Sequence, residues 1–175
     1  MAKNNHYIDN KVFLAEMTKY KMAIEIALEQ GKKKPQIPRY AAEAFMKIAE
    51  NLSHKPNFLS YSFRDEMVAD AIENCVMYAS NFDPKKSSNP FAYFTQIAYY
   101  AFLRRIQREK KQLYVKYKST EQAGILDEFE QLELEDGSSR QFELYENISE
   151  FIENFENAKK EKKFKKMNLE KFVEE

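Results

Sequence analysis

The 175-residue chain has no tryptophan, three glycines and one cysteine, and each scarcity excludes something. Three scattered glycines leave no glycine-rich phosphate loop and argue against a turn-rich sheet protein. Cys75 has no partner for a disulfide, and nothing near the N-terminus resembles a signal peptide, so we expect a reducing cytoplasm. No apolar run approaches the roughly 20 residues that cross a bilayer, so we expect no membrane partner.

Histidine is also scarce, and this argues against catalysis. His6 lies in a polar N-terminal stretch and His54 in a loop, and neither pairs visibly with Cys75, which we interpret as an inert core thiol. Glu50 and His54 are four residues apart, which is not the Glu-x-x-His spacing of di-iron helical bundles. The sequence therefore predicts no enzyme, no catalytic residue, no metal ligand and no cofactor.

What is abundant favours an all-α fold. Hydrophobic residues make up 43% of the chain and aromatic residues 14%. Apolar residues recur at helical spacing and predict helices over 10–30, 40–52, 62–79 and 90–116, with a further amphipathic helix over 142–155. Gly31 is expected to end the first helix, and Asn89 followed by Pro90 is a strong start for the fourth. Residues 54–60 are predicted to be a loop, and Ser62 with Asp65 forms an imperfect capping box.

The charges are sorted into blocks although their formal sum is zero. Residues 85–118 hold nine bases and one acid, residues 119–157 hold twelve acids and one arginine, and residues 159–166 hold six lysines and one acid. A surface with a purely structural role usually carries positive and negative charges interspersed with one another. We interpret the acidic block as a linker or mobile flap, and masking of the basic helix by this block in the free protein is one hypothesis.

The stretch NPFAYFTQIAYYAFLRRIQREKK, residues 89–111, places six aromatic rings within fourteen residues, directly before a basic run. At 100° per residue one face is expected to be core; it holds Phe94, Ala98, Ala101, Phe102 and Arg105. A second face mixes rings, amides and a guanidinium; it holds Tyr93, Gln96, Ile97, Tyr100, Arg104 and Gln107. That mixture can stack unpaired bases and hold their phosphates, although an aromatic core with a solvated basic face explains the same pattern.

The segment EMVADAIENCVMYASNFDPKKSSNPFAYFTQIAYYAFLRRIQREKK resembles region two of sigma-seventy-type transcription initiation factors. It has the acidic-edged helix, the corner at Phe82 and Asp83, a short loop, and an aromatic helix that runs into bases. The segment is more similar still to the late-gene sigma factors of T-even-type bacteriophages, which share the short sequence motifs at residues 66–73, 81–83, 89–96 and 105–111. The resemblance covers residues 40–118, and outside it only the C-terminus looks similar.

The resemblance implies two interfaces. The helix before the corner would dock on the clamp coiled coil of the largest subunit of bacterial core RNA polymerase, through Glu66, Ala69, Asp70 and Ile72. The aromatic helix would melt an A/T-rich minus-ten promoter element and hold the separated strand, through Tyr93, Gln96, Ile97, Tyr100, Arg104, Arg105, Arg108, Lys110 and Lys111. Tyr93 matches the base-stacking tyrosine of the family. Gln96 and Ile97 replace its paired tryptophans, and Tyr99 or Phe91 could substitute for that wall.

The C-terminal sequence MNLEKFVEE also resembles the C-terminus of the phage late-gene sigma factors. The resemblance implies that Leu169, Phe172 and Val173 bind the phage sliding clamp, while a frayed helix end is the alternative. A late co-activator and the cytoplasm of an infected bacterial host follow from the same resemblance. The implied organisation is an N-terminal helix and basic linker (1–36), a compact helical sigma region-two-like domain (37–118), an acidic connector and helix (119–158), and a basic spacer with the tail (159–175).

One further class stays open at this stage. A helical DNA-binding transcriptional regulator without sigma activity would explain the basic block, although it would not explain the acidic docking face or the tail. A sigma factor should need core polymerase for tight promoter binding, whereas a plain regulator should bind duplex DNA alone.

Overall fold

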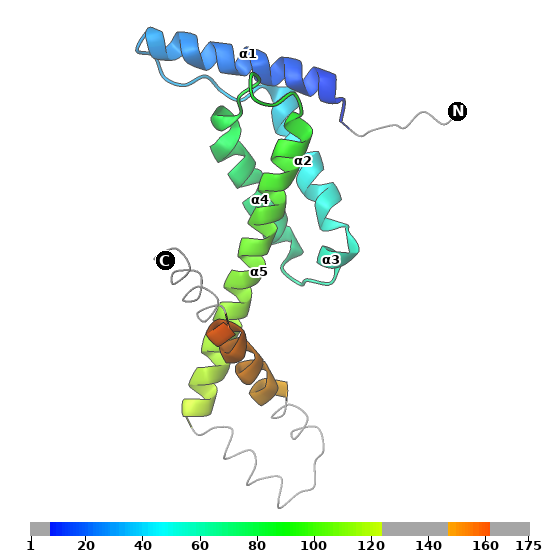
Figure 1. Ribbon diagram of the computed structural model, residues 1–175, viewed down its shortest axis with the longest axis vertical. Coiled ribbons are helices and arrows are strands. Elements are labelled where there is room, and N and C mark those ends of the chain that lie inside the picture. The colour runs from blue at the N-terminus through cyan, green and yellow to red at the C-terminus, as the bar shows by residue number, and fades with distance from the viewer. Residues whose placement is uncertain (1–7, 124–146, 162–175) are drawn as a thin grey trace, which may run out of the picture. The chain divides into compact units, whose positions relative to one another are not determined.

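The computed structural model of the chain describes residues 8–123 and 147–161, and these are helices and their connections, without a strand. The predicted all-α fold is confirmed. The helices are α1 (Asn10–Glu29), α2 (Arg39–Ser53), the single turn α3 (Pro56–Leu59), α4 (Arg64–Tyr78), the 3₁₀ turn η1 (Ala79–Asn81) and α5 (Pro90–Gln122) (Figure 1). The chain divides into two units, residues 1–107 and 108–175, which are considered separately.

Local side-chain chemistry sets both ends of α1. The Asp9 carboxylate accepts hydrogen bonds from the backbone N–H groups of Lys11 (2.8 Å) and Val12 (3.3 Å), so Asp9 caps the helix. At the other end Gly31 has a φ of +62°, a left-handed conformation that glycine adopts without steric cost. Its neighbour Lys32 donates to the Ala27 carbonyl at 2.8 Å, which closes the α1 C-terminus as a Schellman motif. The predicted stop at Gly31 is confirmed.

The predicted start of α5 is confirmed as well. The Asn89 side-chain oxygen accepts from the Ala92 backbone N–H at 3.0 Å, and Pro90 occupies the first helical position, where no N–H is needed. The α5 backbone also receives support from α1, because the Phe91 N–H donates to the Asn10 side chain at 3.2 Å. The helix continues to Gln122, six residues beyond the predicted end.

The core of the first unit is aromatic and joins all its helices. Phe94 of α5 lies 4.5 Å from Phe45 of α2, 5.6 Å from Phe13 of α1 and 6.0 Å from Phe82, measured between ring centroids. All four rings are at most 1% exposed. The small side chains Ala41, Ala44, Ala49, Ala71, Ala98 and Ala101 line the same cluster. Because small residues let helix backbones approach closely, the helices can pack around the ring cluster without voids.

Two sequence expectations in this unit were wrong. The predicted loop at 54–60 contains α3, because Pro56 can begin a helical turn and Phe58 is buried beneath it. The capping box does not form, since Phe63 is the N-cap of α4 and makes no side-chain cap. Not every apolar residue of these helices is buried: Val12, Leu28 and Val76 are 43%, 73% and 43% exposed, whereas Tyr20 of α1 is buried.

In the second unit, a helix over residues 147–161 packs on the C-terminal part of α5. Ile148 and Ile152 are buried there, and the Phe155 ring stacks on Tyr114 with centroids 4.4 Å apart. This confirms the predicted amphipathic helix over the part of it that the structure describes; its predicted beginning at 142–146 lies outside the described residues. No helix within 8–123 or 147–161 is long and apolar enough to cross a bilayer.

Candidate nucleic-acid interface

Helix α5 sorts its side chains by face, as its sequence predicts. Phe94, Ala98, Ala101 and Phe102 are buried, which confirms the predicted core face. Tyr99 and Tyr100 remain 40% and 50% exposed, and Gln96 and Arg104 are also exposed. The predicted second face therefore divides into an exposed part and a half-buried part that packs against the core.

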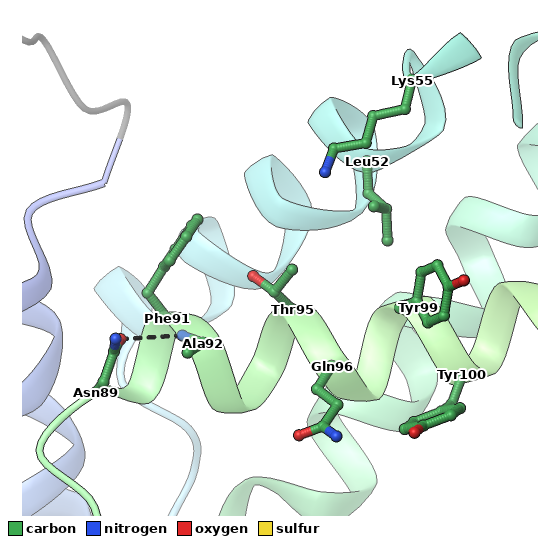
Figure 2. Close-up of a pocket in the computed structure, with 9 residues that line it drawn as sticks. All are labelled: Leu52, Lys55, Asn89, Phe91, Ala92, Thr95, Gln96, Tyr99 and Tyr100. Carbon is green, nitrogen blue, oxygen red and sulfur yellow. Dashed lines mark hydrogen bonds between the residues drawn. The ribbon is translucent and has the colours of Figure 1, made fainter. Parts of the chain in front are cut away.

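The exposed part borders a shallow open groove of about 690 Å³. Figure 2 shows its walls: α5 provides one side, and the end of α2 with the residue before α3 provides the other. The lining residues are Leu52, Lys55, Asn89, Phe91, Ala92, Thr95, Gln96, Tyr99 and Tyr100. The lining thus includes rings, an amide and one ammonium group; Phe91, Thr95 and Tyr99 point toward the α2 side, whereas Gln96 and Tyr100 project from α5 away from it (Figure 2). These groups have the chemistry to stack a planar aromatic ligand and to contact an anion attached to it.

Helix α3 holds one of the groove rings in place. The buried Phe58 ring meets Tyr99 edge to face at 5.8 Å and Phe102 at 5.0 Å, so Tyr99 rests against a side chain that is itself packed in the core. Tyr100 meets Tyr99 edge to face at 5.9 Å. Edge-to-face ring pairs of this kind contribute about 0.5–1.5 kcal/mol beyond their buried area. They therefore favour the arrangement in which the two tyrosines lie at the groove.

Tyr93 and Ile97 lie elsewhere. Both are half-buried against the core, and neither lines the groove. The Tyr93 ring meets Phe82 at 5.3 Å and Phe94 at 5.0 Å, and burial raises the pKa of its hydroxyl. Of the residues predicted to contact a DNA strand, the structure therefore brings Gln96 and Tyr100 together in the groove and places Tyr93 and Ile97 on the flank beside α4.

Two neighbouring arginines join α5 to α4. The Arg105 guanidinium makes a bidentate ion pair with the Asp70 carboxylate, with contacts of 2.7 and 2.8 Å, and the two side chains are 16% and 28% exposed. The Arg104 guanidinium donates to the Asn74 side-chain oxygen at 2.7 Å. Asp70 was predicted to bind polymerase and Arg105 to bind DNA; in this structure they bind each other.

The outer face of α4 keeps part of the predicted docking surface. Glu66 and Ala69 are exposed, whereas Ile72 is half-buried and packs against the core. The exposed strip continues through Glu73 to the apolar Val76 and Met77 at the end of the helix. An acidic strip with an apolar end is suited to a basic amphipathic helix.

The remaining predicted bases belong to the second unit. Arg108, Lys110 and Lys111 are exposed there. Lys118 pairs with Glu121 at 2.7 Å and with Glu156 at 3.4 Å, so acidic residues close in sequence and from the packed helix neutralise the end of the basic run. The predicted clamp-binding residues Leu169, Phe172 and Val173 lie outside the described residues.

The Cys75 thiol is fully buried and burial raises its pKa to about 12, so it carries no thiolate near neutral pH. Within 8–123 and 147–161, no group of three histidine, cysteine or acidic side chains could hold a metal ion.

Sequence reasoning named Phe91 and Tyr99 only as substitutes and missed the opposite wall of the groove. Leu52 ends an amphipathic helix and reads as core, and Lys55 stands in what reads as a loop. Both reach the groove because α2 packs along α5, a contact between distant parts of the chain that no local pattern encodes. The sequence sign of this wall is a lysine beside a proline, Lys55 and Pro56, and that pair alone does not predict a binding surface.

Comparison with known proteins adds no family to this geometry: no protein-family model matches the chain, and no curated protein is significantly similar to it.

Proposed function

We propose that the protein is an RNA polymerase sigma factor of the phage late-gene type, which directs the host core enzyme to A/T-rich minus-ten promoter elements and opens them. The observation that carries this proposal is the sorting of α5, with a buried core face and an exposed tyrosine, glutamine and arginine surface on one helix. The resemblance of residues 40–118 to sigma region two supplies the substrate and the partner.

The groove supports the DNA part of the proposal. Extruding a base from a duplex costs a few kcal/mol, and stacking on an aromatic side chain returns roughly 1–3 kcal/mol per base, so two or three rings suffice to hold a short separated segment. Tyr99, Tyr100 and Phe91 supply rings at one surface, and Lys55 at its edge can contact a phosphate. In this proposal the groove rings replace the tryptophan wall of the larger family, and Tyr93 supports the flank beside them.

The strip on α4 supports the polymerase part. Glu66 and Glu73 are exposed acids on one face of the helix, with Ala69 between them and an apolar end at Val76 and Met77. Asp70 is engaged by Arg105, so the proposed contact with the polymerase clamp coiled coil depends first on Glu66. Coupling of a desolvated charge pair across such an interface is about 1.5 kcal/mol or more.

The remaining parts of the proposal come from the resemblance alone. Leu169, Phe172 and Val173 are proposed to bind the phage sliding clamp. A late co-activator is a further proposed partner, and the infected host's cytoplasm is the proposed location.

Deletion of residues 169–175 should abolish clamp-dependent activation and leave basal transcription intact. Equal loss of both activities would contradict a clamp motif.

The decisive experiment compares promoter binding with and without core polymerase. A labelled duplex with an A/T-rich minus-ten element is titrated with the protein, with core enzyme, and with both. Tight binding and permanganate-reactive thymines should appear only when both are present. Equal binding by the protein alone would instead identify a DNA-binding regulator without sigma activity.

Substitutions at Tyr100 test the groove within the same assay. Tyr100→Ala should reduce promoter opening about tenfold, because one stacking contact is worth roughly 1–3 kcal/mol. Tyr100→Phe keeps the ring and is the matched control, so it should open the promoter nearly as well as the unaltered protein.

Charge reversal at Glu66 should weaken assembly with core polymerase and leave the fold unchanged. Normal assembly would exclude that face as the docking surface.

A further inference from the structure

Arg104 and Arg105 are adjacent in sequence but differ in the charge of their partners. Arg105 is bound to a carboxylate, Asp70, by two short hydrogen bonds and is largely buried. Arg104 is exposed and is bound at 2.7 Å to an amide oxygen, that of Asn74, one helical turn along α4 from Asp70. The first pair cancels its charge, and the second holds a cation without cancelling it.

The orientation of Asn74 follows from its own hydrogen bonds. Its side-chain NH₂ donates to the Asp70 backbone carbonyl at 2.6 Å, which directs the amide oxygen toward α5. A guanidinium has donors only, so the opposite amide orientation would place donor against donor and lose both contacts. Asn74 is therefore fixed by its helix before it meets Arg104.

Within the part of the chain that the structure describes, no carboxylate lies within ion-pair distance of the Arg104 guanidinium, so its charge is not paired. A guanidinium that is already held loses little side-chain entropy when an anion binds, and its charge remains available. Arg104 also follows Tyr100 by one helical turn, a separation of about 5–6 Å between Cβ atoms. That spacing suits the base and the phosphate of one nucleotide.

We infer that Asn74 is a positioning residue, which holds the Arg104 guanidinium beside the groove for a phosphate of the DNA strand whose base stacks on Tyr100. This inference rests on the proposed function and adds a residue and a role to it. A neutral amide is essential to that role, because a carboxylate at position 74 would pair with Arg104 and neutralise it, as Asp70 neutralises Arg105.

The test uses the full chain and a fluorescein-labelled A/T-rich single-stranded oligodeoxynucleotide, with anisotropy measured over a range of salt concentrations starting low. Asn74→Asp should weaken binding about three- to tenfold at low salt and reduce the slope of log affinity against log salt by about 0.7, the value for one lost phosphate contact on a single strand. Arg104→Ala should do the same, and the double variant should lose no more than either. Asn74→Ala should weaken binding by only about two- to threefold and keep the slope, because the arginine charge remains.

Asn51→Asp is the matched control. Asn51 of α2 also donates its side-chain NH₂ to the carbonyl four residues earlier, that of Lys47 at 2.8 Å, but has no arginine partner. It should leave the salt slope unchanged. Thermal denaturation of Asn74→Asp and Asn51→Asp shows whether each variant is folded at the assay temperature, so weaker binding by a folded variant cannot be attributed to unfolding.

The outcomes separate the inference from the proposed function. If Arg104→Ala weakens binding and Asn74→Asp does not, the positioning role is wrong while the DNA surface stands. If Arg104→Ala also binds normally, or if the unaltered chain does not bind the oligonucleotide at low salt, the DNA role of this surface is wrong and the inference falls with it. Side-chain ¹⁵N relaxation of Arg104 gives a ligand-independent check: unchanged order of its Nε in Asn74→Ala would overturn the positioning role directly.

Discussion

Two tyrosines of the first unit, Tyr20 and Tyr40, differ in whether their hydroxyl groups have hydrogen-bond partners. The Tyr20 side chain is 3% exposed, and its hydroxyl has no hydrogen-bond partner among the described residues. Burial raises the pKa of that hydroxyl, as expected for a phenol kept away from water. Tyr40, in contrast, accepts from the Asp9 backbone N–H at 3.1 Å and donates to the Asp9 carbonyl at 3.2 Å.

Replacing Tyr20 by phenylalanine should stabilise the protein. The change removes a desolvated hydroxyl that gains nothing in return, so the free energy of unfolding should rise by about 1 kcal/mol. Tyr40→Phe is the matched control and should lower it by about 1 kcal/mol, because it breaks two contacts to α1. Urea denaturation measures both. A loss of stability in Tyr20→Phe would mean that the hydroxyl is hydrogen-bonded.

Asp70 and Arg105 provide the second prediction at this scale. Removing one partner of a half-buried bidentate pair leaves the other charge uncompensated, so Asp70→Asn should lower the free energy of unfolding by about 1–3 kcal/mol. Glu73→Gln, on the exposed face of the same helix, should change it by less than about 0.5 kcal/mol. A double-mutant cycle with Arg105→Gln isolates the coupling. Equal effects of Asp70→Asn and Glu73→Gln would show that the Asp70–Arg105 ion pair does not stabilise the fold.

Among the elements, α5 is notable because it contributes to the cores of both units. Its first half is fixed by Asn89 and by the aromatic core, whereas its last turns carry Tyr114, Tyr117 and Lys118 beneath the 147–161 helix. Tyr114 donates a hydrogen bond to Glu156 at 2.9 Å, and this bond is the main reason that the pKa of Glu156 is lowered and that of Tyr114 raised. The packing of one helix on the other is therefore linked to pH.

The 147–161 helix should loosen from α5 as the pH falls below 4.5. The folded-state pKa of Glu156 lies below its ordinary value of 4.5, so its contribution to packing is fully present above that value and is lost as the pH falls through the folded-state pKa. Nuclear Overhauser contacts between the Tyr114 and Phe155 rings should weaken over that range. Glu156→Gln should remove this pH dependence. Glu153→Gln, an exposed acid on the same helix, should preserve it, and an unaltered titration in Glu156→Gln would exclude this linkage.

For the molecule as a whole, the two units differ in how much core each possesses. Every buried residue of the aromatic cluster lies between Ile8 and Ile106, within the first unit. The second unit has two buried residues, Ile148 and Ile152, with two half-buried tyrosines beside them. Burying an isoleucine contributes roughly 1.5–3 kcal/mol, whereas ordering each residue of a helix costs about 1–2 kcal/mol.

Amide hydrogen exchange should therefore separate the units. Amides of α2, α4 and α5 up to Gln107 should exchange slowly and near the rate of global unfolding, while those of 147–161 should exchange much faster through local opening. Mass spectrometry of exchanged peptides measures both in one experiment. A chain ending at Gln107 should keep a cooperative urea transition. Equal protection of the two units would contradict this division and indicate a single cooperative structure.

The sequence by itself determined the helical fold, the ends of α1 and α5 and the buried face of α5, because capping and the 3.6-residue period are local properties of the chain. It did not determine the single turn of α3, the wall that Leu52 and Lys55 add to the groove, or the pairing of Asp70 with Arg105. Those features depend on which helix lies against which, and the residues that line the groove are up to 48 positions apart. An acid and a base that look separately available in the sequence become partners because tertiary packing brings them within hydrogen-bonding distance.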